Sequence, residues 1–148
     1  MEQVTLEKML CMAATIQANA YAPYSKFMVG AAVLTKTGNI YAGCNMEGVD
    51  YDGTHAEESA LAVMVGAGER SPTVILVVGA PEDIEPKIVM PCGKCRQKLY
   101  EFVSLSGYEL DVVTVSPDGE YVYTKLSELP PFAFGPADLG IDLAKYRR

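Results

Sequence analysis

Apolar residues recur along this chain at two spacings, and each spacing predicts a different kind of element. Residues 4–19 repeat apolar side chains at the spacing of a helix, and further helices are predicted at 54–68 and 91–104. Residues 74–79 form a continuous apolar run rich in β-branched side chains, which is typical of a central strand covered on both faces. The other predicted strands span 27–35, 40–45, 109–115 and 121–124.

The connections between these segments fix how the strands run. Residues 37–39 (Thr-Gly-Asn) make a turn, so the strands on either side of it form a hairpin. Residues 116–119 (Ser-Pro-Asp-Gly) are too few for a crossover helix, so the strand that follows returns antiparallel. From Leu126 onward the chain is rich in proline and is predicted to form short helical turns. The result is one domain, residues 1–148, with an α/β fold: a three-layer α/β/α sandwich around a mixed sheet of about five strands.

The charge balance limits the partners that this protein can hold. Its 148 residues carry a net charge of −7, and the pI is near 4.7. A protein that holds nucleic acid by its phosphates needs a stripe of Lys and Arg, and the sequence shows none. The composition therefore disfavours a nucleic-acid partner and favours a small, uncharged substrate.

The sequence also indicates a compartment. The first residues lack a basic stretch followed by an apolar one, and no run reaches the length of a membrane span. We expect a cytoplasmic protein without a membrane partner. In a reducing compartment its four cysteines are expected to be metal ligands or buried thiols rather than disulfides.

The single histidine and a Cys-x-x-Cys pair together predict a metal site. The chain reads His55-Ala-Glu57 and later Pro91-Cys92-Gly-Lys-Cys95, and H-x-E…P-C-x-x-C is the signature of the zinc-dependent nucleobase deaminases. Zinc prefers nitrogen and sulfur ligands, and a site with three protein ligands keeps a fourth position open for catalysis. Alone, the cysteine pair could be a redox pair or a coincidence, and a lone histidine is usually structural. Their conjunction with Glu57 and Pro91 predicts one Zn²⁺ per chain, held by His55, Cys92 and Cys95.

Glu57 is the candidate catalytic residue. It lies on the first turn of the helix that supplies His55, so its carboxylate can face the open coordination position. There it could take a proton from water that the metal has made acidic and pass protons to a ring nitrogen and a departing amine. The alternative is a solvated acid favoured by the helix dipole. We assign the catalytic role to Glu57 and the solvated role to Glu58.

Several segments resemble the cytidine deaminase family. They are residues 21–27 (YAPYSKF), 29–32 (VGAA), 43–47 (GCNME), 91–97 (PCGKCRQ) and 134–139 (FGPADL). These segments span most of the chain in the family's order. The resemblance implies a cytidine deaminase-like fold and hydrolytic deamination of cytidine and 2′-deoxycytidine to the uridine products and ammonia, a reaction of pyrimidine salvage.

The resemblance also implies roles for residues outside the metal site. Phe27 would line the base site, and Asn45 with Glu47 would hydrogen-bond the ribose 3′-hydroxyl. An amide and a carboxylate at alternate positions face the same way and can divide donor and acceptor roles; a surface Asn-Glu turn is the alternative. Phe134 resembles an aromatic residue that reaches into a neighbouring subunit's site, so the resemblance implies a homotetramer.

Among the departures from the family's pattern, two lie at the metal site. Most short members have Cys as the first ligand and Arg directly after the catalytic Glu, where this chain has His55 and Glu58. Three thiolates on Zn²⁺ leave a net negative site that an Arg relieves. One imidazole and two thiolates leave a neutral site, so the Arg is dispensable and an acid is tolerated.

Three alternatives to a cytidine deaminase remain open. The first is a deaminase of a modified cytosine nucleoside such as a blasticidin S-type antibiotic, against which Asn45 and Glu47 argue. The second is a nucleotide or polynucleotide deaminase, which the net charge disfavours. The third is a non-catalytic, zinc-stabilised binding protein, against which the missing fourth ligand argues.

Overall fold

Helices and strands follow one another along the chain in the order that the sequence predicts. The computed structural model describes residues 2–81, 88–115, 119–129 and 142–146. Its α-helices are α1 (Gln3–Gln17), α2 (Ala56–Gly66) and α3 (Gly93–Ser106). Its strands are β1 (Phe27–Thr35), β2 (Ile40–Cys44), β3 (Pro72–Pro81), β4 (Asp111–Val115) and β5 (Tyr121–Lys125). Two short 3₁₀ turns, η1 (Leu126–Glu128) and η3 (Ala144–Tyr146), agree with the short helical turns predicted for the C-terminal part.

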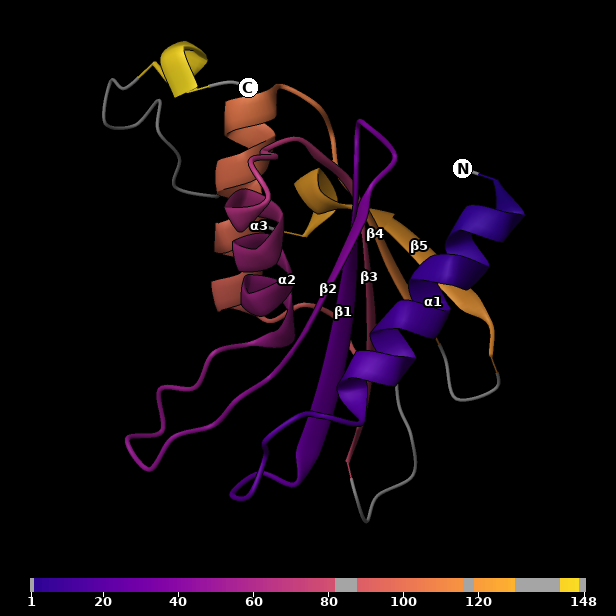
Figure 1. Cartoon of the computed structure of the whole chain (residues 1–148), viewed down its shortest axis with the longest axis vertical. Helices are drawn as coiled ribbons and strands as arrows, with labels where there is room; N and C mark the ends of the chain where they lie inside the picture. Colours follow the sequence, from indigo (N-terminus) through magenta and orange to yellow (C-terminus); the bar gives the residue numbers. More distant parts are fainter. Residues whose placement is uncertain (1, 82–87, 116–118, 130–141, 147–148) are drawn as a thin grey trace.

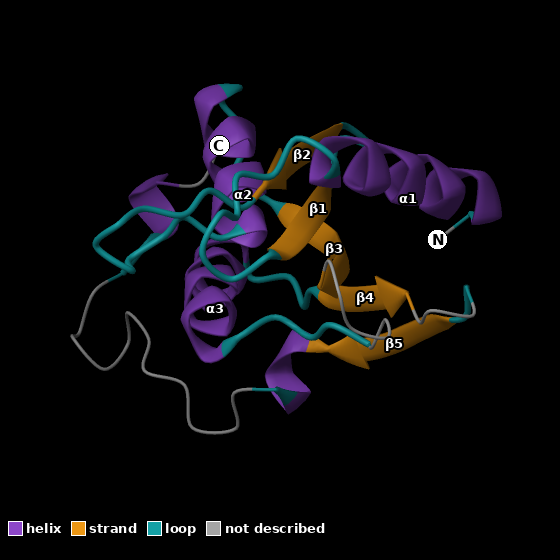
Figure 2. Ribbon diagram, turned by 90° about the horizontal axis from the view of Figure 1, so that it is seen from below, coloured by secondary structure: helices purple, strands orange, loops and turns teal. Residues whose placement is uncertain are grey.

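The strands form one mixed sheet in the order β2-β1-β3-β4-β5. The β3–β4 pair is parallel, and the β1–β2, β1–β3 and β4–β5 pairs are antiparallel. Helix α1 covers one face of the sheet, while α2 and α3 cover the other (Figures 1 and 2). The three-layer α/β/α sandwich with a mixed five-stranded sheet is therefore confirmed.

Strand β3 lies in the middle of the sheet and divides the core into two parts. Its side chains alternate: Ile75 and Val77 pack in the cluster under α2 and α3, whereas Val74 and Leu76 pack in the cluster under α1. All four are at most 4% exposed. A strand buried on both faces has no reason to alternate polar with apolar residues, which explains the continuous apolar run.

Two glycines allow the helices to lie close to the sheet. A Cβ on Gly43 of β2 would lie 2.4 Å from the backbone nitrogen of Ala60 in α2. A Cβ on Gly30 of β1 would lie 2.0 Å from the carbonyl oxygen of Ala13 in α1. Any larger residue at either position would push a helix away from the sheet. The contact at Gly43 matters for function, because it fixes the helix whose N-terminus carries His55.

Some boundaries differ from the predicted ones. The second helix begins at Ala56 rather than Thr54, because Thr54 pairs with Met46 in an isolated bridge and His55 is an extended N-cap. Strand β3 extends beyond the predicted 74–79 because it pairs with β1 along almost its whole length. The predicted 116–119 turn lies largely outside the described residues.

Glu69, just beyond α2, ties that helix to the β1–β2 turn. Its carboxylate accepts hydrogen bonds from Thr37, Asn39 and Tyr41. Hydrogen bonds from Thr35, Asn39 and Thr37 lower the pKa of Glu69 to about 2. A pKa below the unfolded value means that this stabilisation is complete above about pH 4.5 and is lost as the pH falls towards 2.

We therefore expect Glu69→Gln to lower the melting temperature at pH 7 by about 2–4 °C, the shift that ~1 kcal/mol produces in a domain of this size. At pH 2 the variant and the parent should melt together, because the parent's carboxyl group is then losing its charge. Thermal melts followed by circular dichroism across this pH range measure both effects. Glu101→Gln, at an exposed position of α3, is the control; an equal shift there would contradict the role given to Glu69.

Candidate active site

Three potential metal ligands come together from two helix N-termini. The Nδ1 atom of His55 lies 3.2 Å from Sγ of Cys92 and 3.3 Å from Sγ of Cys95. All three ligand atoms lie within 4.8 Å of one another. Ligands bound tetrahedrally to one zinc at about 2.0–2.3 Å lie roughly 3.5–3.8 Å apart, so this group needs only a slight expansion to fit the ion. The sequence-predicted ligand set is thus brought together, with one nitrogen and two sulfurs.

The local backbone explains why these residues meet. His55 is the extended N-cap of α2, and Cys92 is the extended N-cap of α3. Cys95 lies one turn into α3 and is buried. Both helices cover the same face of the sheet (Figure 1), and their N-termini point to the same end of the site.

The environment of Cys95 favours a bound cation. Burial raises the pKa of the Cys95 thiol well above its usual range, and the neighbouring Glu57 and Cys92 raise it further. A metal ion reverses this effect, because a coordinating thiol loses its proton. The donor set and its surroundings therefore fit a zinc ion.

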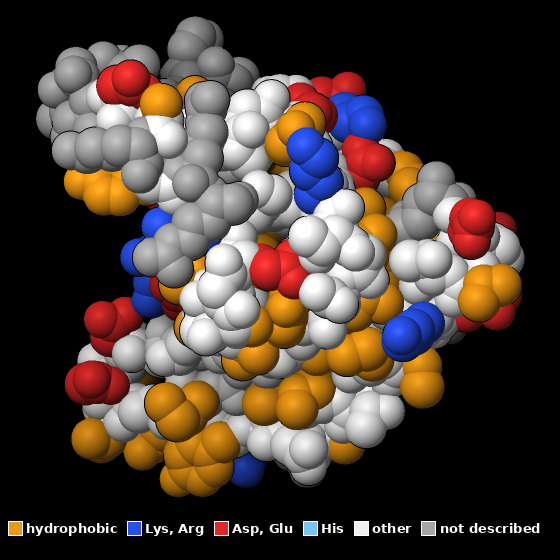
Figure 3. All heavy atoms as spheres, turned by 45° about the horizontal axis from the view of Figure 1, so that its top comes forward, with side chains coloured by type: hydrophobic (Ala, Val, Ile, Leu, Met, Phe, Trp, Pro, Cys, Tyr) orange, Lys and Arg blue, Asp and Glu red, His pale blue; other side chains and the backbone are white. Residues whose placement is uncertain are grey.

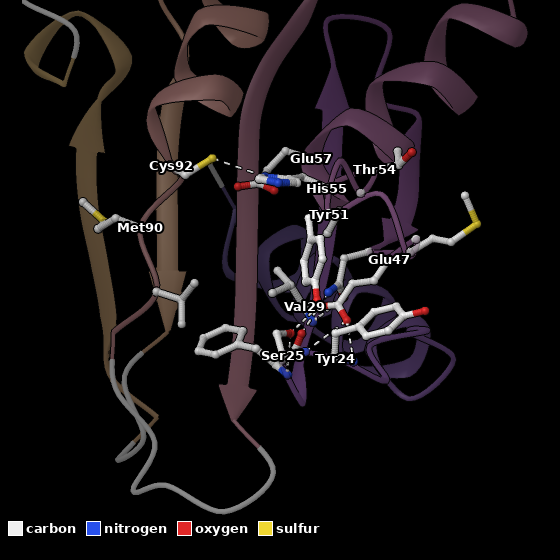
Figure 4. A pocket seen from close by; sticks show the side chains of 17 residues that line it. Tyr24, Ser25, Val29, Glu47, Tyr51, Thr54, His55, Glu57, Met90 and Cys92 are labelled. Carbon is white, nitrogen blue, oxygen red and sulfur yellow. Dashed lines mark hydrogen bonds between the residues drawn. The ribbon is translucent and has the colours of Figure 1, made fainter.

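Glu57 is buried beside the ligand group. It is only 5% exposed, and Figure 4 shows it next to His55. A carboxylate buried this deeply needs a proton or a charged partner. A metal held by the neighbouring ligands would supply such a partner. The position of the Glu57 carboxylate also suits a residue that transfers protons near that metal.

Two of the three ligands, His55 and Cys92, line a cavity of about 540 Å³. Figure 4 shows His55, Glu57 and Cys92 at one end and Ser25 with Glu47 at the other, with Tyr51 between them. The volume lies within the range of about 300–1,000 Å³ that is typical of small-molecule sites. A metal at one end and polar groups at the other suit a substrate with a reactive ring and a hydroxylated tail.

Comparison with known proteins identifies the family. Residues 3–106 match the family model for the cytidine and deoxycytidylate deaminase zinc-binding region, a stretch that runs from α1 to the end of α3. The chain belongs to this deaminase family. Its cofactor is Zn²⁺, as the family's zinc-binding region and the His55, Cys92 and Cys95 group indicate.

Relatives match over nearly the whole chain. A cytidine deaminase of Sporosarcina psychrophila is 38% identical over 135 residues, which cover 90% of this chain and 94% of the relative. The crystal structure of a cytidine deaminase from Burkholderia pseudomallei is 34% identical, with a TM-score of 0.76, and the match covers 90% of this chain and 100% of that one. The cytidine deaminase structure from Mycobacterium tuberculosis is 30% identical, with a TM-score of 0.69, and the match covers 88% and 97% of the two chains. The cytidine deaminase-like fold is thereby confirmed.

In this deaminase, Asn45 and Glu47 both line the cavity. The side chain of Asn45 is anchored to β1: Oδ1 accepts the Val29 N–H at 2.8 Å, and Nδ2 donates to the Phe27 carbonyl at 2.8 Å. An amide has a second N–H and a second lone pair, which leaves Asn45 the capacity to bind a ligand as well. The hydrogen bonds to the Val29 and Phe27 backbone fix the directions in which the second N–H and the second lone pair of Asn45 point.

Glu47 is held in place by the 21–26 segment. Its carboxylate accepts the backbone N–H groups of Tyr24 at 2.9 Å and Ser25 at 3.1 Å, and the Ser25 hydroxyl donates to it as well. The Ser25 hydroxyl is the main cause that lowers the pKa of Glu47. Glu47 is therefore an anionic acceptor at the end of the cavity opposite the metal ligands.

The two aromatic predictions have different outcomes. Phe27 begins β1, lines the cavity and packs over Gly79 of β3, where a Cβ would lie 3.0 Å from the Phe27 ring. Its place at the base site remains a prediction that this position supports. Phe134 lies outside the described residues.

Glu58 has partners that the sequence does not reveal. Its carboxylate accepts the His55 backbone N–H at 3.0 Å and lies 3.4 Å from the ammonium of Lys94. Burial raises the pKa of Glu58, but these two contacts outweigh it and hold the pKa below its usual value. Glu58 is therefore a paired cap of α2 and not the solvated acid that the sequence predicts.

The aromatic rim of the cavity was not predicted from the sequence. The rings of Tyr24 and Tyr51 lie 6.0 Å apart, centroid to centroid, and both residues line the cavity. Tyr51 has a positive φ of 60°, which is unusual for a residue with a side chain. The only indication in the sequence that Tyr51 lies at the site was its position in a Gly- and Asp-rich loop, since loops often carry functional residues.

Proposed function

We propose that this protein removes the exocyclic amine of cytidine and 2′-deoxycytidine by hydrolysis, giving uridine or 2′-deoxyuridine and ammonia. The observation that carries the proposal is one cavity that is lined by Glu57 and the ligands His55 and Cys92, and also by Asn45 and Glu47. The named relatives are cytidine deaminases. We place the reaction in pyrimidine salvage in the cytoplasm.

The metal end carries the chemistry. When bound by His55, Cys92 and Cys95, zinc would acidify a water molecule and make it nucleophilic at neutral pH. Glu57 would take a proton from the attacking water and deliver it to the ring nitrogen next to carbon 4. As the oxygen of that water replaces the exocyclic nitrogen at carbon 4, Glu57 would pass the second proton to the departing amine, which leaves as ammonia.

The other end of the cavity binds the sugar. Glu47 is anionic and can only accept, so it suits a hydroxyl donor, and the second N–H of Asn45 suits the lone pairs of the same hydroxyl. Phe27 and Val29 supply apolar wall between the two ends. This arrangement supports binding of an uncharged nucleoside through its 3′-hydroxyl.

The surface agrees with a small substrate. The described part of the face in Figure 3 shows Lys and Arg side chains in scattered places and no continuous basic stripe. A polynucleotide would need such a stripe to hold its phosphates. None of the described helices is long and apolar enough to cross a bilayer.

We also infer that the chain assembles as a homotetramer. Large apolar side chains are exposed on two segments near the cavity. An isolated β-bridge between Tyr21 and Met46 joins these segments. The exposed side chains are those of Tyr21, Tyr24, Met46, Val49 and Tyr51, which are 49–86% exposed. Contiguous exposed apolar groups of this kind usually mark an interaction site. Light scattering should therefore give four times the chain mass of 16.0 kDa; a monomer would contradict the inference.

A substrate panel tests the proposed function. We expect ultraviolet absorbance to show turnover of cytidine and 2′-deoxycytidine but not of a single-stranded oligodeoxynucleotide. Removing the 3′-hydroxyl, as in 2′,3′-dideoxycytidine, should lower kcat/KM by at least about tenfold, because a hydrogen bond to a charged group contributes about 1.5–3 kcal/mol. Turnover of blasticidin S alone would move the assignment to modified cytosine nucleosides. A zinc-loaded protein that deaminates none of these compounds would overturn the proposal.

A further inference from the structure

The zinc ligands come from two segments that lie far apart in the sequence, so the covalent chain alone does not fix the distance between them. His55 caps α2, whereas Cys92 and Cys95 open α3, some forty residues later in the chain. The ligand atoms of the two segments must nevertheless stay within a few tenths of an ångström of a productive geometry. Something in the fold must therefore fix the N-terminus of α2 against that of α3.

Lys94 lies between the two cysteines and reaches across to the His55 segment. Its ammonium donates to the Gly53 carbonyl at 3.2 Å and to the Asp52 carboxylate at 3.2 Å, and it lies 3.4 Å from the Glu58 carboxylate. An ammonium has three N–H donors, so these acceptors match its capacity. All three belong to the loop before His55 or to the first turn of α2.

Glu58 completes the connection. Its carboxylate contacts the ammonium of Lys94 on one side and accepts the backbone N–H of His55 on the other. The Glu58 side chain is only 15% exposed and that of Lys94 is 42% exposed, so the pair is partly buried, and salt screens it less than a fully exposed ion pair. We propose that Lys94 and Glu58 are positioning residues of the zinc centre, which hold His55 at the correct distance and orientation from Cys92 and Cys95.

Charge gives the pair a second effect. An imidazole and two thiolates neutralise Zn²⁺, but Glu57 adds one negative charge beside the centre and Glu58 would add another. The ammonium of Lys94 lies against Glu58 and offsets this added negative charge. The contact between Lys94 and Asp52 contributes less, because the Asp52 side chain is 84% exposed and exposed ion pairs contribute little.

This inference concerns the metal centre and does not depend on which nucleoside is the substrate. The test measures zinc release from the purified, zinc-loaded protein to a chromogenic chelator. Loss of a residue that orients metal ligands usually weakens metal affinity about 10–100-fold, so we expect Lys94→Met to speed release by about that factor. Lys94→Arg should keep release within about threefold of the parent, because it preserves the charge and the donors. Lys98→Met, at an exposed position one turn along α3, is the matched control and should leave release unchanged.

A second readout separates positioning from general stability. In the cobalt(II)-substituted protein, the visible absorption bands report the ligand geometry, and Lys94→Met should change them while Lys98→Met should not. A merely structural role would lower the melting temperature of the zinc-free and zinc-loaded forms equally and leave release and spectrum unchanged. That result would overturn the proposal.

Glu58→Gln keeps the proposal testable if Lys94→Met does not fold. Glutamine retains an acceptor for the His55 N–H but loses the charge that faces Lys94. We expect zinc release to become faster than in the parent, by less than in Lys94→Met. Release at the parental rate from Glu58→Gln would show that the pair does not position the ligands, whether or not the protein deaminates cytidine.

Discussion

Glu57→Gln should abolish most of the deaminase activity while leaving zinc in place. Glutamine has the shape of glutamate but cannot accept a proton at neutral pH, and Glu57 is the buried acid that Figure 4 shows beside His55. General acid–base groups contribute about 10²–10⁴-fold, so kcat for cytidine should fall at least a hundredfold. Because Glu57 acts at the ring and not at the sugar, KM should change much less than kcat. Steady-state kinetics together with the zinc content of each preparation measure these effects.

A charge-matched control is available on α3. Glu101→Gln removes one acid from an exposed position further along α3, where the side chain does not line the cavity, so its kinetics should equal those of the parent. Full activity in Glu57→Gln would show that another group transfers the protons. A Glu57→Gln protein that loses its zinc would instead show that the carboxylate is needed to keep the metal bound.

The zinc site was predictable because its signal is local and chemical. Few combinations of residue types can bind zinc, and this chain has a single histidine, so His55 had no competitor. The helices around the ligands followed from the spacing of apolar residues, and all three ligands lie at the N-termini of two of these helices, where they meet. The apolar run that becomes β3 marked the centre of the sheet in the same way.

The supporting contacts were not predictable, because they join residues that lie far apart in the sequence. Lys94 meets Glu58 only after both helices have docked on the same face of the sheet. Glu69 meets the β1–β2 turn for the same reason. Spacing along a sequence shows which residues share a helix face, but it does not show which side chains from different elements will touch. For that reason Glu58 looked like a solvated acid in the sequence and is a paired one in the structure.

Cys95→Ala should remove the metal and with it the activity. Cys95 is fully buried, and this burial raises the pKa of its thiol. Only a bound cation would therefore stabilise the thiolate form of this residue. The substitution leaves only His55 and Cys92 as ligands, which is fewer than the three protein ligands that catalytic zinc sites use. Zinc content should fall from about one ion per chain to a small fraction of that, and cytidine turnover should become undetectable. Elemental analysis after gel filtration measures the metal.

The melting temperature of Cys95→Ala shows what the metal contributes to the fold. Zinc binds only to the folded ligand group, so its loss should remove the stability that binding supplies, and chelator-treated parent protein should melt near the variant. Cys11→Ala is the control, since that cysteine is exposed on α1, away from the ligand group; it should keep zinc, activity and melting temperature. If Cys95→Ala kept a full zinc complement, the assignment of this sulfur as a ligand would be wrong. If it lost zinc but melted like the zinc-loaded parent, the metal would serve chemistry alone, and the contacts between Lys94 and Glu58 would hold the two helices together without it.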